Sequence, residues 1–332
     1  FDICILKICS VYVPNTKTLL LASRMDEAQK TFIYAKELAY NYLEFKERLY
    51  TFSWIKFENF DQVLNNFYAS YFAGALILPK AKYSSKGFLF VSQLSFKLIL
   101  SLDHTLAELS KDNISIPKAS ISEKLHKLFA KKAFDETLFL DIIKSFNASP
   151  ESFYQRLTNI LPKEFNIQNL FFLRFTHRAG TERFHLKKEL HLSHQHSPHA
   201  NESNEHYCRR WVSLKVLKEI SNTQKEHIFN MQISNYPSDD MRYLVLSSAT
   251  KDPFKEGHFR SIALGLLIDK QLLRKLAFLE HANIQQMDVG VTCERCNIKD
   301  CQVRQAPAIR LEHKAKNKQI ALVVEDLMKK FS

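Results

Sequence analysis

Glycine is unusually scarce in this chain, and its scarcity limits the loops that the fold can contain. Only 6 of the 332 residues are Gly, and no two of them lie closer than eight positions. A Walker A loop needs two glycines five residues apart, and a dinucleotide-binding fingerprint packs three into six residues, because the backbone must approach phosphate closely. Neither loop can be built here, so we exclude nucleotide binding through the standard phosphate loops.

The overall composition is that of a folded chain with a sizeable core. Hydrophobic residues make up 45% and charged residues 25% of the sequence, and no apolar run is long enough to cross a membrane. We therefore expect a cytoplasmic protein with no membrane partner. The start at Phe1 has no initiator Met, and it resembles a strand within a longer chain more than a signal peptide.

The net charge of +12 raises the question of an anionic partner. Nucleic acid, phosphate-bearing small molecules and acidic surfaces all carry the required negative charge. A codon bias toward Lys, Asn, Ile, Phe and Tyr in an AT-rich genome explains the same excess without any partner. The charge alone leaves both interpretations open.

The hydrophobic pattern changes near residue 165, from a helical period to short β-rich runs separated by turns. Before this point we predict a strand at 18–23 and helices at 26–50, 60–78, 86–110, 119–132, 135–146 and 150–160. After it we predict strands at 169–176, 182–192, 225–235, 241–250 and 259–268, and helices at 208–220, 270–280 and 315–330. The pattern therefore predicts an α+β protein with a helical domain over residues 1–165 and a domain with an antiparallel sheet over residues 166–332.

Three of the six cysteines form a C-x2-C-x4-C motif, at Cys293, Cys296 and Cys301. Three thiolates this close in sequence can converge on one centre, and a zinc site or a [4Fe–4S] cluster then needs a fourth ligand. Cys208 is the favoured fourth ligand, because it begins a predicted helix in the same domain, where the helix dipole stabilises a thiolate. Cys4 and Cys9 have apolar neighbours and are interpreted as small hydrophobic residues.

The spacing of the motif leaves the identity of the metal open. Zinc modules usually present two C-x2-C pairs, whereas this chain has one pair and a distant Cys, which slightly favours an iron–sulfur cluster. A histidine-rich stretch is a second potential metal site, but its spacing fits no particular geometry, so we interpret it as a polar surface loop. Its members are His177, His185, His191, His194, His196, His199 and His206.

Around the cysteine motif the sequence resembles a known family. Residues 288–307 are similar to the C-terminal signature of the short-chain fatty-acyl regulators, roughly G-x-x-C-x-x-C-x-x-x-x-C-x-x-R-A-x-P-P. Gln305 is inserted between the usual Arg and Ala, and Ala308 replaces the second Pro. The resemblance continues upstream, at residues 146–158, 170–175 and 207–211.

The resemblance implies a sensory role. These regulators are XRE-type transcription factors with an N-terminal helix-turn-helix domain, and the actinobacterial propionate-catabolism regulators are members. A GAF-like sensory domain would hold a [4Fe–4S] cluster and bind coenzyme A or an acyl-CoA, with the cluster ligands at Cys208, Cys293, Cys296 and Cys301. DNA would be bound by a helix-turn-helix domain absent from this chain, in a homodimer that reads two half-sites.

Three arginines near the cysteines are candidate contacts for the phosphates of coenzyme A: Arg209, Arg210 and Arg304. Guanidinium groups bind phosphate well because their N–H groups form a fork of donors. The same residues are equally interpretable as solvated surface charges.

The N-terminal half resembles an ImmA/IrrE-type metallopeptidase domain that has lost its zinc site. Residues 67–79 are similar to that family's E-x-x-A-N-x-F-A-x-x-L-L-x-P. The H-E-x-x-H helix is replaced by a segment in which only Glu37 is kept, because Lys36 and Tyr40 stand at the histidine positions and Asn66 at the third ligand. Lys has no lone pair for zinc and Tyr is a poor ligand near neutral pH, so we expect a degenerate zincin-like domain that binds no metal and is no enzyme.

Three functions are compatible with the sequence. The favoured one is the ligand-sensing region of a transcription regulator. The second is a zinc-stabilised nucleic-acid-binding module, which the positive charge supports although no winged-helix, finger or RNA-binding signature is present. The third is a residual metallopeptidase that depends on Glu37, and a basic Lys36 that binds an anionic ligand is a further possibility for that site.

Overall fold

The computed structural model describes residues 8–13, 16–23, 25–45, 51–52, 60–78, 120–192, 205–252, 255–280 and 284–331. The helix predicted at 86–110, as well as Cys4, His194, His196 and His199, lies outside these ranges. The chain divides into two compact units. The first comprises residues 1–167 with 252–256 and 274–281, and the second comprises residues 168–251, 257–273 and 282–332.

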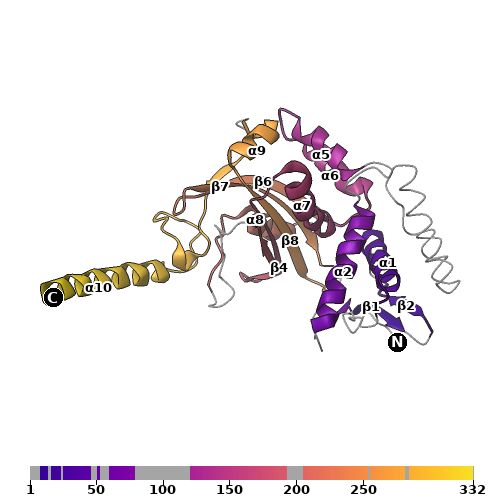
Figure 1. Ribbon diagram of the computed structural model, residues 1–332, viewed down its shortest axis with the longest axis horizontal. Coiled ribbons are helices and arrows are strands. Elements are labelled where there is room, and N and C mark those ends of the chain that lie inside the picture. Colours follow the sequence, from indigo (N-terminus) through magenta and orange to yellow (C-terminus); the bar gives the residue numbers. More distant parts are fainter. Residues whose placement is uncertain are drawn as a thin grey trace. The chain divides into compact units, whose positions relative to one another are not determined.

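The first unit begins with a small antiparallel sheet in the order β2-β1-β3, formed by β1 (Ile8–Val13), β2 (Thr18–Leu21) and β3 (Thr51–Phe52). Two helices follow, α1 (Glu27–Tyr42) and α2 (Phe60–Ile77), which lie against each other (Figure 1). Asp26 begins α1 with a capping box, and Glu44 in the left-handed region follows its end. The helix is therefore shorter than the 26–50 predicted.

Small side chains at the interface between α1 and α2 allow close packing. Ala35, Ala39, Ala69 and Ala73 are all fully buried, so the two backbones approach each other without the loss of side-chain entropy that longer residues would incur. Tyr40 packs with Ala39 and Ala69 in a small apolar cluster.

Three more helices complete the first unit: α5 (Ile121–Phe129), α6 (Glu136–Ser145) and α7 (Pro150–Phe165). Each begins where the chain supplies an N-cap oxygen, from Ser120, Asp135 and Ser149. Pro150 occupies the first turn of α7, and Asn166 in the left-handed region ends it, five residues beyond the predicted end. The short helices α9 (Lys270–Lys275) and η3 (Ala277–Glu280) replace the helix predicted at 270–280.

The second unit is built on a six-stranded sheet in the order β5-β4-β8-β7-β6-β9. The strands β4 (Leu170–Arg178), β5 (Phe184–His191), β6 (His227–Tyr236), β7 (Met241–Lys251) and β8 (His258–Leu267) pair antiparallel. The short β9 (Gln286–Asp288), which the sequence did not predict, pairs parallel to β6. The five predicted strands lie within two residues of the observed ends, because runs of aromatic and β-branched residues bounded by turn residues mark strand limits well.

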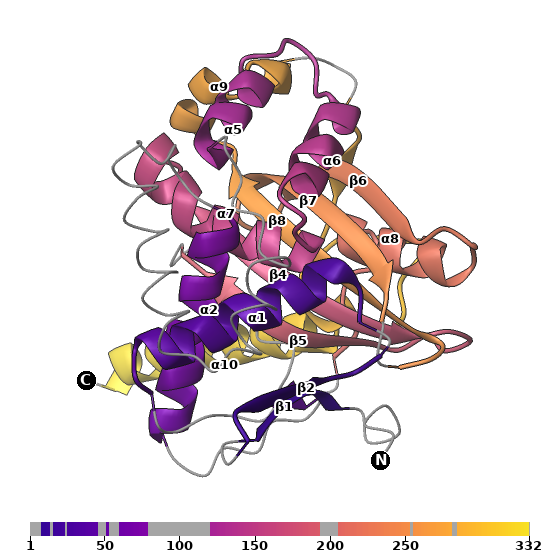
Figure 2. The ribbon, with the colours of Figure 1, turned by 90° about the vertical axis from the view of Figure 1, so that its right-hand side faces the viewer.

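Helix α8 (Val212–Ser221) covers one face of this sheet and contacts β4, β6, β7 and β8 (Figure 2). The face is apolar at alternate positions, including Phe171, Leu173 and Phe175 of β4. Gly265 on β8 leaves room for the Phe171 ring, since a Cβ there would meet the ring at 2.2 Å. Trp211, directly before α8, belongs to the same core.

The structure confirms a chain that mixes helices with antiparallel sheet. The zincin-like and GAF-like assignments of the two halves remain predictions. In the part of the chain that the structure describes, none of the helices has the length and apolarity needed to span a bilayer.

Candidate functional site

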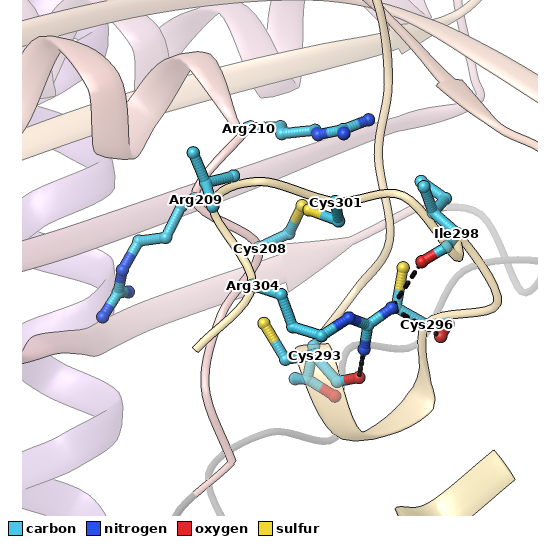
Figure 3. Close-up of a pocket in the computed structure, with 10 residues that line it drawn as sticks. Cys208, Arg209, Arg210, Cys293, Cys296, Ile298, Cys301 and Arg304 are labelled. Atoms are coloured by element: carbon cyan, nitrogen blue, oxygen red, sulfur yellow. Dashed lines mark hydrogen bonds between the residues drawn. The ribbon is translucent and has the colours of Figure 1, made fainter. Parts of the chain in front are cut away.

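Four cysteines from two distant segments line a single pocket (Figure 3). Cys208 lies in the segment that leads into α8, Cys293 begins the short helix η4 (Cys293–Arg295), and Cys296 and Cys301 follow in the loop after it. All four thiols are free, and all but Cys301 are buried. The structure therefore brings together the four residues that the sequence singled out as metal ligands.

Backbone pairing between residues 205–211 and 288–293 brings Cys208 to the other three. Tyr207 and Thr292 form an isolated antiparallel bridge. The Cys208 N–H donates to the Val291 carbonyl at 3.1 Å, and the Cys293 N–H donates to the His206 carbonyl at 2.8 Å. Trp211 adds a buried side-chain bond, from its Nε1–H to the Gly290 carbonyl at 2.9 Å.

Glu205 is a buried carboxylate that joins the same two segments. Its Oε2 accepts from the Thr292 hydroxyl at 2.6 Å and from Arg295 Nε at 2.8 Å. Arg295 Nη2 donates to the other oxygen at 2.9 Å, which makes the pair bidentate. Arg310, in the first turn of α10 (Ile309–Phe331), lies 3.4 Å from Oε1.

Glu294 is a second buried carboxylate, one residue after Cys293. It accepts from the His206 backbone N–H at 3.0 Å and lies 2.7 Å from His206 Nδ1. Sequence reasoning did not identify Glu205 or Glu294. The available signal was weak, namely an acidic residue near a cysteine in each segment, and acidic residues are most often solvated.

The Arg304 guanidinium is directed into the loop that carries Cys293, Cys296 and Cys301, here called the cysteine loop (Figure 3). Its Nη1 donates to the carbonyls of Cys293 at 2.9 Å and Ala306 at 3.4 Å. Its Nη2 donates to the carbonyls of Cys296, at 3.3 Å, and Ile298. Four N–H groups of this side chain are thus engaged by backbone oxygen, although the sequence suggested Arg304 as a phosphate contact.

Arg209 and Arg210 also line the pocket, but their head groups bind elsewhere. Arg209 Nη2 donates to the Glu182 carbonyl at 2.6 Å, and its guanidinium lies 4.4 Å from the centre of the Phe184 ring. Arg210 Nη1 donates to the Asp288 carbonyl at 3.2 Å. Both arginines place positive charge beside the cysteines.

Burial dominates the electrostatics of the Cys208 thiol. It raises the pKa of this thiol to about 11, although backbone hydrogen bonds from Gly290 and Arg210 oppose it. Cys293 also has a donor, since the Gln305 N–H lies 3.4 Å from its Sγ. N–H donors stabilise thiolate, and a bound cation would favour the deprotonated form further.

The donor set suits a thiophilic metal. Thiolate ligands select zinc or iron–sulfur centres over Mg²⁺ or Ca²⁺. Within the described ranges, no group of three or more His, Cys, Asp or Glu side chains is placed to hold a single metal ion.

Gly290 allows the close approach of Cys296. A Cβ at position 290 would meet the Cys296 Sγ at 2.7 Å and its Cβ at 2.9 Å. We expect Gly290→Ala to displace the Cys296 side chain and to weaken metal retention about tenfold or more, measured as metal per chain after dialysis against a chelator. Gly74→Ala is the control, because a Cβ there meets nothing within 4 Å. Equal metal retention in the two variants would contradict a role for Cys296 as a ligand.

The remaining sequence candidates lie in the first unit. Lys36, Glu37 and Tyr40 are on α1, where the Lys36 ammonium lies 5.9 Å from the centre of the buried Tyr40 ring. Asn66 is on α2 and is partly buried. The structure does not test the absence of metal at these positions.

In the second unit His177 stacks on Phe184 and His191 contacts Glu189, so these two histidines have structural partners.

Comparison with known proteins gives one match, which lies within the second unit. Residues 187–324 match the family model of the short-chain fatty acyl coenzyme A regulator, C-terminal. The match includes all four pocket cysteines and the three arginines, and it does not extend to α1 or α2. No curated protein and no solved structure gave a significant match.

Proposed function

Because residues 187–324 belong to the short-chain fatty acyl coenzyme A regulators, we propose that this chain is the ligand-sensing region of a transcription regulator. Cys208, Cys293, Cys296 and Cys301 hold a [4Fe–4S] cluster in this proposal. The observation that carries it is the pocket itself, since cysteines from two distant segments line one cavity and none forms a disulfide. Residues that pack only as small hydrophobes would have no reason to gather in this way.

The spacing of the motif favours a cluster over a single zinc ion, because zinc modules usually present two C-x2-C pairs and this chain has one pair and a distant Cys. A single zinc ion takes four sulfurs about 2.3 Å from one point. A cluster takes one thiolate at each of four iron corners, so its ligands stand farther apart around a common pocket. When bound, the cluster would supply a redox- and oxygen-sensitive centre to the sensory unit.

The protein groups around the pocket are suited to a centre of net negative charge. Arg209, Arg210 and Arg304 line the same pocket as the four cysteines, and Arg304 directs its guanidinium to the carbonyls of two of them. Backbone N–H donors approach two of the sulfurs, from Gly290 and Arg210 to Cys208 and from Gln305 to Cys293. Such donors and charges tune the reduction potential of iron–sulfur centres.

The signal in this proposal is a short-chain acyl-CoA or coenzyme A, and the output is binding of DNA. A ligand changes the output only if it binds two conformations of the protein unequally. The scarcity of Gly requires that side chains and sheet surface hold the ligand, because no phosphate loop is present in the sequence. DNA is bound through a helix-turn-helix domain outside this chain, in a homodimer.

Anaerobic purification tests the cluster and the ligand together. We expect about four irons and four sulfides per chain, visible absorbance that bleaches in air, and a co-purifying acyl-CoA or coenzyme A in the mass spectrum. Absence of both iron and sulfide would overturn the cluster. One zinc per chain, with DNA binding by these residues alone, would instead favour a zinc-stabilised nucleic-acid-binding module, the reading that the +12 charge supports.

A further inference from the structure

The Arg304 side chain holds the cysteine loop together from within. Its guanidinium donates to the carbonyls of Cys293, Cys296, Ile298 and Ala306. Its backbone N–H donates to the Cys301 carbonyl at 3.1 Å. Arg304 therefore contacts the main chain of all three cysteines in the C-x2-C-x4-C motif.

The loop needs such a contact because it has little regular structure. Between η4 and α10, residues 296–308 form no helix or strand, so their carbonyls have few partners from secondary structure. A planar guanidinium offers five N–H groups in fixed directions, whereas an ammonium is a compact charge with three donors. Only Arg among the natural side chains presents a rigid fork that spans four carbonyls at once.

We propose that Arg304 is a positioning residue, which keeps the Cys293–Cys301 loop in its ligand-ready arrangement before any metal is bound. It does so through the loop backbone and not through coenzyme A phosphates. Four of its N–H groups are already bonded to protein oxygen, so a phosphate would have to displace those bonds. This role rests on the proposed function only for the identity of the bound group, since the contacts exist in the protein alone.

Cys208 supplies an internal reference. It comes from another segment and is held by the Val291 carbonyl, the Tyr207–Thr292 bridge and the neighbouring Trp211. None of these contacts involves Arg304. Loss of the Arg304 guanidinium should therefore release Cys293 and Cys296, whose carbonyls it binds, and leave Cys208 protected.

The test measures the alkylation rate of each cysteine by iodoacetamide in metal-free protein, with mass spectrometry of the peptides. We expect Arg304→Ala to raise the rates at Cys293 and Cys296 about tenfold or more, because the hydrogen bonds from a charged donor to their carbonyls are lost. The rate at Cys208 should change less than about twofold. Lys299→Gln is the matched control, since it removes an exposed positive charge from the same loop without removing these contacts.

One further variant and a rescue experiment separate positioning from other roles. Arg304→Lys should behave like Arg304→Ala, because the charge is kept but the fork is lost. Millimolar guanidinium should slow alkylation in Arg304→Ala and leave Arg304→Lys unchanged, because the ammonium fills the space. Equal acceleration at all four cysteines would overturn the proposal in favour of general unfolding. Unchanged alkylation with weaker binding of coenzyme A would show that Arg304 is a ligand contact.

The same samples distinguish this proposal from the cluster. Iron and sulfide are measured in the anaerobically purified wild-type protein. If that protein holds neither, but alkylation follows the expected pattern, the cluster assignment fails while the positioning role stands. If iron is present and alkylation does not respond to Arg304→Ala, the positioning role fails and the cluster stands.

Discussion

Replacing any one of Cys208, Cys293, Cys296 or Cys301 by Ser is expected to abolish the iron content of anaerobically purified protein. Each cysteine supplies one corner ligand of the proposed cluster, and a hydroxyl is a much poorer ligand for iron than a thiolate. The pocket lining includes no other sulfur that could take over the position. Iron and sulfide per chain and the visible spectrum measure the effect.

The controls for this prediction come from the same chain. Cys4→Ser and Cys9→Ser remove the two cysteines that are not assigned to the pocket, so both variants should keep the iron content of the wild type. Urea denaturation of each metal-free variant shows whether the fold is kept. A Cys208→Ser variant that retained full iron would contradict the assignment of the fourth ligand. Loss of iron from the Cys9→Ser variant would also contradict the assignment of Cys208 as the fourth ligand.

Trp211→Ala is expected to lower the free energy of unfolding of the second unit by about 3–5 kcal/mol. The Trp211 side chain is only 4% exposed. Its ring lies 6.0 Å from those of Phe175 and Tyr207, and its Nε1–H satisfies the Gly290 carbonyl. The variant loses the packing of a large aromatic residue and also leaves a buried carbonyl without its donor.

Trp211→Phe separates these two contributions. Phe keeps most of the apolar volume but has no N–H, so we expect a loss of about 1–3 kcal/mol from the unsatisfied carbonyl. Urea denaturation followed by circular dichroism on metal-free protein measures both variants. A loss below about 1 kcal/mol in Trp211→Ala, under the core range, would show that the start of α8 is not anchored to the cysteine loop in solution.

The site connects these effects through one set of contacts. The Trp211 Nε1–H donates to the Gly290 carbonyl, and the carbonyl of the next residue, Val291, accepts the backbone N–H of Cys208. Glu205 links the same segment to Arg295 and to Arg310 at the start of α10. A change at the cysteines is therefore placed to affect α8 and the first turn of α10, the elements next to the pocket.

Much of the second unit was predictable from the sequence. Apolar and β-branched runs bounded by turn residues marked its five long strands, and the signature around Cys293 resembled the regulator family whose model matches residues 187–324. The prediction of helix 208–220 was right about the element but wrong about its start. Trp211 is the N-cap, so Cys208 lies in the preceding turn.

Other features were not predictable because they depend on long-range pairing. The strand β9 has only three residues and forms because β6 offers an edge. The end of α1 near Tyr42 reflects the left-handed conformation of Glu44, which carries no clear sequence signal. Short elements of this kind obtain their stability from neighbours and not from local preference.

By itself, the sequence determined which chemistry the chain has available. The scarcity of Gly excludes the standard phosphate loops, and the C-x2-C-x4-C spacing places three thiols within one loop, because both properties are local. Only the tertiary structure decided how that chemistry is used. Cys208 joins the motif through hydrogen bonds between two distant segments. The Arg304 guanidinium donates to backbone carbonyls of the cysteine loop because the fold places those carbonyls beside it. A guanidinium suits phosphate and carbonyl oxygen alike, so its role depends on which acceptors the fold places beside it.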